Sequence, residues 1–87
     1  MTDSLPAGMI DVVLEGYTTS AQTVTLAVRI KPRSGSVALY LAPTDARPAF
    51  ICDGPGRQVT LGCQSGMIYM RKLYGAVDVE VRAVSWG

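Results

Sequence analysis

The sequence of 87 residues contains no histidine, no asparagine and only two cysteines. Without histidine, Ser-His and Cys-His catalysis and histidine-ligated metal sites cannot arise within this chain. Two cysteines alone cannot complete a zinc site either. We therefore expect a protein that is not an enzyme and holds no cofactor, and we assign no catalytic, cofactor-binding or metal-ligating residue.

Charge is also scarce. Charged residues make up 17% of the sequence, and eight Lys and Arg against seven Asp and Glu leave a formal net charge of +1. Proteins that bind nucleic acid usually carry a concentrated basic patch, so we expect no nucleic-acid partner. Hydrophobic residues make up 48%, which excludes intrinsic disorder. The length fits a single domain, because two cores would each be too small.

The first eight residues are polar and include Pro6 and Gly8. They predict an N-terminal arm at 1–8, followed by one domain at 9–87. The arm has neither the positive charge nor the apolar stretch of a signal peptide. No apolar run approaches the roughly 20 residues that a membrane-spanning helix needs. We expect no membrane partner, and synthesis in the cytoplasm without signal-dependent export.

Alternation of apolar and polar residues is the main structural signal. Val24, Leu26, Val28 and Ile30 share one side of an extended chain, whereas a helix would scatter them around its circumference. Alternation and turn residues together predict strands at 9–15, 21–31, 36–42, 49–52, 57–63, 67–74 and 76–86. Six to seven strands with a turn about every ten residues indicate an all-β fold. We favour a small antiparallel β-sandwich, because the cleanly alternating strands need a second sheet to cover them; a barrel is the alternative.

The strongest turn signal is Asp53-Gly54-Pro55-Gly56. We interpret this turn as a simple hairpin, in which Cys52 lies opposite Arg57 rather than Cys63. A cross-strand disulfide is therefore not expected, and we predict two free, buried thiols. A bridge between two packed sheets remains the alternative.

Two strands depart from the simple pattern. The segment 67–74 is partly apolar on both faces, so we expect it to be poorly protected from pairing with another chain. Alternation places Tyr69 and Arg71 on one of its faces and Tyr74 on the other. In the last strand, alternation directs Trp86 outward together with the charged residues.

One pair of carboxylates is a candidate catalytic site. Asp78 and Glu80 lie two residues apart on one strand face, and paired carboxylates can hydrolyse glycosides when they flank a cleft. Here we interpret them as a solvated face whose charges pair with Arg29, Lys31 or Arg82. The cysteines are interpreted as core residues, since no neighbouring base lowers their pKa.

The candidate interaction surface consists of four aromatic residues and one arginine: Tyr40, Tyr69, Arg71, Tyr74 and Trp86. Aromatic side chains on a flat surface contact either another protein or a sugar ring. We favour a protein, because the chain lacks the asparagine and histidine that accompany aromatic rings in sugar sites. Arg71 and Lys72 beside tyrosines also suggest single-stranded nucleic acid, but neighbouring residues point to opposite faces of a strand and form no patch.

The whole chain resembles, in the general character of its sequence, the small all-β structural proteins of tailed bacteriophages. The resemblance is carried by the start Met1-Thr2-Asp3-Ser4, the polar arm, the strand Gln22-Thr23-Val24-Thr25-Leu26 and the ending within a strand at 79–87. It implies a non-enzymatic virion component, made in the host cytoplasm, that self-associates or docks on capsid or tail proteins. Capsid decoration or cement proteins and small tail or fibre-associated subunits are the members it resembles. The alternative is a β-sandwich module that binds carbohydrate or a cell surface.

Overall fold

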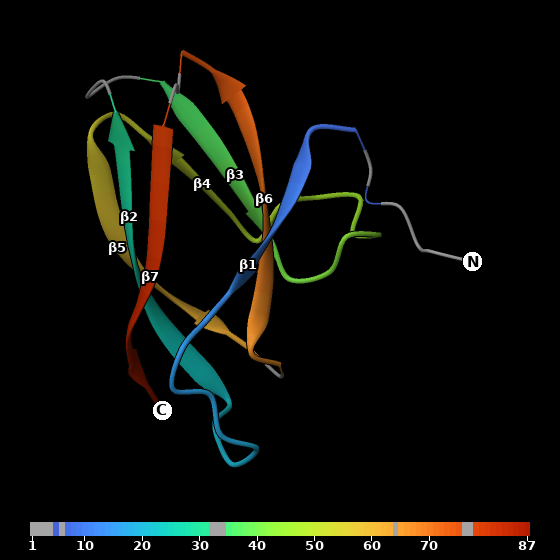
Figure 1. Cartoon of the computed structure of the whole chain (residues 1–87), viewed down its shortest axis with the longest axis vertical. Coiled ribbons are helices and arrows are strands. Elements are labelled where there is room, and N and C mark those ends of the chain that lie inside the picture. Colours follow the sequence, from blue (N-terminus) through green and yellow to red (C-terminus); the bar gives the residue numbers. More distant parts are fainter. Residues whose placement is uncertain (1–4, 6, 32–34, 64, 76–77) are drawn as a thin grey trace.

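The computed structural model describes residue 5 and residues 7–31, 35–63, 65–75 and 78–87. Within these residues the chain forms seven antiparallel strands and no helix (Figure 1). The strands are β1 (Met9–Val13), β2 (Thr23–Lys31), β3 (Ser36–Tyr40), β4 (Phe50–Asp53), β5 (Gly56–Gly62), β6 (Met67–Tyr74) and β7 (Asp78–Trp86). None of the described residues belongs to a helix of the length and apolarity that crossing a membrane requires. Most of the predicted arm at 1–8 lies outside the described residues.

The strands form two separate sheets, so the predicted β-sandwich is confirmed and a closed barrel is not formed. The four-stranded sheet has the order β1-β6-β3-β4, and the three-stranded sheet has the order β5-β2-β7. β6 is an inner strand, bonded to β1 on one side and to β3 on the other. The expectation that 67–74 is poorly protected from pairing is therefore wrong. The free edges in the described chain belong to β1, β4, β5 and β7.

The main core lies between the two sheets, and β2 shows how the sequence builds it. The four apolar side chains that alternate along β2 are all buried, as predicted, because they face the opposite sheet. Both other strands of the three-stranded sheet pair with β2. The buried residues of this core are Leu14, Val24, Leu26, Val28, Ile30, Val37, Leu39, Cys52, Cys63, Ile68 and Met70.

The turn at 53–56 does not form the expected hairpin. β4 pairs with β3 and β5 pairs with β2, so this turn carries the chain from one sheet to the other. Gly56 approaches β2 so closely, at φ 147°, that a Cβ atom there would collide with the carbonyl oxygen of Val28. Glycine is needed at this crossing because any other side chain would meet the β2 backbone. Cys52 and Cys63 are both free and buried, which confirms the prediction for the thiols.

A bulge in β7 reverses the predicted orientation of Trp86. The register of β7 on β2 shifts between Thr25 and Leu26, which leaves Val84 without a partner and sets Trp86 opposite Val24. Directly paired residues lie on the same face of an antiparallel sheet. Because Val24 faces the core, Trp86 does so too, and the expected outward orientation is wrong. One inserted residue is enough to move every later side chain to the other face.

Trp86 closes one end of the sandwich. Its ring packs against the main core and meets the ring of Tyr17 edge-on, with 5.4 Å between the centroids. Its Nε1–H donates a hydrogen bond of 2.9 Å to the carbonyl oxygen of Glu15. Trp86 therefore fastens the segment after β1 to the end of β7.

Candidate interaction surface

A second, smaller apolar cluster lies on the side of the four-stranded sheet that faces away from the core. Met9, Ala38 and Tyr40 are buried there, with Tyr69 packed against them. β3 is consequently buried on both faces along its whole length. Figure 1 shows the connection 41–49 on this side of the sheet, away from the three-stranded sheet. Small clusters of this kind are typical beneath long loops.

Arg71 lies within this outer face. It stands in register between Met9 on β1 and Ala38 on β3. Its guanidinium carbon is 5.7 Å from the centroid of the Tyr40 ring, which is within the range of a cation–π interaction. The Nε atom is buried and has no hydrogen-bond partner among the described residues. Arg71 is thus held by apolar and aromatic contacts, and its buried Nε–H has no acceptor within the described chain.

A second bulge, on β6, moves Tyr74 onto the same face. Tyr74 pairs with Ser36 and Lys72 pairs with Val37, so the residue between them has no partner. Since paired residues share a face, Tyr74 joins Arg71 on the outer side, and its predicted place on the opposite side is wrong. Tyr74 is 68% exposed. Lys72 lies on the opposite face from Arg71, as predicted.

The structure therefore brings together four of the five candidate residues and separates Trp86 from them. Tyr40 is only 6% exposed, so it supports Arg71 from below rather than contacting a partner. The alternation analysis missed Val13 and Ile51, which are 70% and 47% exposed on the two edge strands. Each was visible as an apolar residue on an outward position of its strand. We call the following residues the outer apolar face: Val13, Ile51, Met67, Tyr69, Arg71 and Tyr74.

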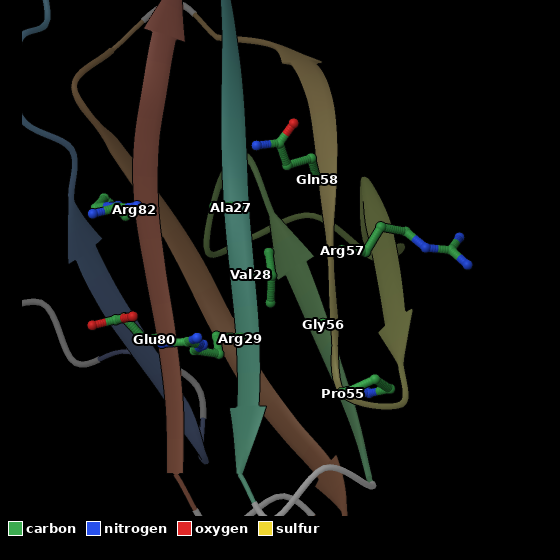
Figure 2. Close-up of a pocket in the computed structure, with 9 residues that line it drawn as sticks. All are labelled: Ala27, Val28, Arg29, Pro55, Gly56, Arg57, Gln58, Glu80 and Arg82. Carbon is green, nitrogen blue, oxygen red and sulfur yellow. The ribbon is translucent and has the colours of Figure 1, made fainter.

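The outer face of the three-stranded sheet is different, because it is polar. A pocket of about 460 Å³ on this side is lined by residues of β2, β5 and β7, among them the charged Arg29, Arg57, Glu80 and Arg82, whose side chains are drawn in Figure 2. Across β2 and β7, Arg29 stands opposite Glu80 and Lys31 opposite Asp78, so the predicted cross-strand register of these charges is confirmed. The described residues contain no group of three His, Cys, Asp or Glu that could hold a metal ion.

The two thiols lie in core surroundings. Burial raises the pKa of the Cys52 thiol above its ordinary value; nearby Arg57 lowers this pKa and Asp53 raises it, each by less than burial does. The Sγ atom of Cys63 donates to the carbonyl oxygen of Ser65 at 2.6 Å. These surroundings suit a packing role for both cysteines.

The fold and its surfaces define a small antiparallel β-sandwich with one apolar and one polar outer face. Comparisons with protein-family models, with curated proteins and with solved structures found no match for this chain. Its function must therefore be argued from the residues on these surfaces.

Proposed function

We propose that this chain is a non-enzymatic structural protein that docks on a protein assembly through the outer apolar face. The observation that carries the proposal is Arg71, whose buried Nε lacks a partner in the described chain and whose direct neighbours across the sheet are the apolar Met9 and Ala38. Arginine and tyrosine are enriched among the residues that dominate protein interfaces. A partner that offers a carboxylate or a carbonyl oxygen beside an apolar patch would fit this face.

The surrounding exposures support the same proposal. Val13, Ile51 and Tyr74 lie on three different strands of one sheet and are each about half exposed or more. Asp11 and Asp53 lie on the same face, so the exposed apolar side chains are grouped there with charges between them, and apolar surface with polar neighbours marks interaction sites. Tyr40 beneath Arg71 keeps the guanidinium in place, so little side-chain entropy is lost when a partner binds.

The assembly that we propose is a bacteriophage virion. The support is the resemblance of the whole chain to small all-β phage structural proteins, together with a sandwich fold that presents a docking face. The chain would act there as a capsid decoration or cement protein or as a small tail subunit. The direct test is mass spectrometry of purified particles from the source of this sequence. Absence of the chain from such particles contradicts the virion assignment, and cytoplasmic location is then expected.

The docking face is tested with two matched variants. Ile51→Ser removes an apolar side chain from the outer apolar face, and Ile10→Ser removes the same side chain from the other face of the same sheet. Their exposures are similar, 47% and 45%. We expect Ile51→Ser to weaken cosedimentation of the purified chain with particles by about tenfold, and Ile10→Ser to leave it near the wild-type level. Equal binding by both variants would contradict the assigned face.

Glycan-array binding tests the carbohydrate alternative on the same proteins. Tyr69 and Tyr74 share the outer apolar face and could stack on a sugar ring, whereas Trp86 is engaged with the core. Specific glycan binding that Tyr74→Ala abolishes in a folded protein would favour the alternative over docking on a protein.

A further inference from the structure

β7 presents the longest free edge in the described chain. It has nine residues and is bonded to β2 on one side only. The other strands with a free edge have four to seven residues. The bulge at Val84 interrupts only the end of β7, and the residues from Asp78 to Ala83 keep one regular register on β2. A regular edge of this length is a template for pairing with another strand.

The residues of β7 at this edge line a pocket that also faces the end of β1. This pocket of about 300 Å³ is lined by Val13 and Glu15 from the β1 side and by residues 80–83 of β7. Figure 2 shows the side chains of Glu80 and Arg82 on the side of β7 that faces away from β2. Both side chains therefore lie on the free side of β7, where the side chains of a strand added to this edge could meet them.

The charges on β7 are not balanced within its own sheet. Glu80 stands opposite Arg29 on β2, but Arg82 stands opposite Ala27, which carries no charge. No described residue forms an ion pair with Arg82. The edge strand thus carries an acid that faces a base within the sheet and, two residues further on the same face, a base that faces no charge.

We propose that two copies of this chain pair through β7, antiparallel and about a two-fold axis at Val81. Such an axis places Glu80 of each copy opposite Arg82 of the other, and Val79 opposite Ala83. The two three-stranded sheets would then form one continuous sheet across the dimer. Opposite charges directly across an antiparallel pair are favourable, and a two-fold contact makes each favourable pair twice.

Each neighbouring register sets like charges opposite each other, and the register about Val81 avoids this. An axis at Glu80 sets the two Glu80 side chains against each other while it places Asp78 opposite Arg82 twice, and an axis at Arg82 sets the two arginines against each other. An axis at Val79 sets Asp78 against Glu80 twice. Like charges directly opposite each other destabilise a strand pair. Only residues of the same face can pair, so these are the registers that a face-matched two-fold pairing offers around this point.

Charge-reversal variants test this register by sedimentation velocity of the full chain over a range of concentrations. Glu80→Arg and Arg82→Glu each create two like-charge pairs, so each variant alone should dimerise about tenfold or more weakly than the wild type. An equal mixture of the two variants restores complementary charges and should form a heterodimer. The double variant Glu80→Arg with Arg82→Glu should recover the wild-type dimer.

Arg57→Glu is the matched control, because it makes the same charge change on β5 at the far edge of the same sheet. It should leave dimerisation unchanged, and raised salt should weaken the wild-type dimer. Circular dichroism checks that each variant is folded. The mixture is a second check, because two misfolded variants would not form a heterodimer. A wild type that stays monomeric, or a mixture that does not associate, overturns the proposal. Ile51→Ser should leave this dimer intact, so the result is independent of the docking face.

Discussion

Replacement of Trp86 tests whether this side chain stabilises the fold or contacts a partner. In the structure Trp86 packs on the core, meets Tyr17 edge-on and donates to the carbonyl oxygen of Glu15. Trp86→Ala removes all three contacts. Trp86→Phe keeps an aromatic ring at the same place and removes the hydrogen-bond donor. We therefore expect both variants to lose stability, and the alanine variant to lose more.

The magnitudes follow from these contacts. Full burial of a tryptophan makes its replacement by alanine cost about 3–5 kcal/mol, and Trp86 is only half-buried. The hydrogen bond contributes about 0.5–1.5 kcal/mol, and the edge-to-face ring pair contributes a further ~0.5–1.5 kcal/mol. We expect a loss of about 2–4 kcal/mol for Trp86→Ala and about 1 kcal/mol for Trp86→Phe.

Thermal and urea denaturation followed by far-ultraviolet circular dichroism is the appropriate assay, because these variants lack the single tryptophan. For a domain of this size, 1 kcal/mol corresponds to about 4–8 °C in Tm. Val84→Ala, at the exposed bulge residue, is the control and should change stability by no more than about 0.5 kcal/mol. Wild-type stability of Trp86→Ala, combined with lost partner binding, would refute the structural role and restore the outward orientation.

Two further substitutions test the crossing between the sheets and the buried thiol. Gly56→Ala should lower the free energy of unfolding by about 2–4 kcal/mol, because the new Cβ meets the β2 backbone. Gly54→Ala has open space around it and should lower the free energy of unfolding by only about 1–2 kcal/mol, through backbone strain. Equal urea midpoints for the two variants would contradict the close approach of Gly56 to β2. Burial raises the pKa of Cys52. The contribution of the neutral thiol to stability should therefore be complete below the ordinary thiol pKa and be lost as the pH rises through the raised pKa. Cys52→Val should reduce this decline in stability, and absence of the decline in the wild type would count against burial of the thiol.

Residue alternation was sufficient to predict most of the fold. β2 shows why, since a strand with one buried face must separate apolar from polar residues at every second position. The two wrong side-chain orientations, at Tyr74 and Trp86, both follow a bulge. A bulge adds one residue to one strand, and nothing in the hydrophobic pattern around Val84 marks it. Only the pairing with β2, which is distant in sequence, reveals the shift.

The turn at 53–56 shows a second limit. Its glycines and proline identify a turn from local conformational preferences, but they do not say which sheet the next strand joins. That choice depends on the contact of Gly56 with the β2 backbone, which joins residues far apart in the chain. The alternative of a disulfide depends on the same question of which sheet the strand after the turn joins. A hairpin and a crossing between two packed sheets predict different neighbours for Cys52.

The apolar residues of this chain fill two different places in the structure, and the alternation pattern does not say which residue belongs to which place. One part fills the core between the sheets. Another part buries Ala38 and Tyr40 on the outer side of β3, so that strand has no solvent face. A strand that is covered on both sides needs apolar neighbours on its flanking strands, and Ile51 on β4, opposite Ala38, is such a neighbour that remains exposed. The outer apolar face is therefore the exposed border of the cluster around Ala38 and Tyr40, which the chain itself buries only in part. This exposed border is what favours the proposed docking of a partner there.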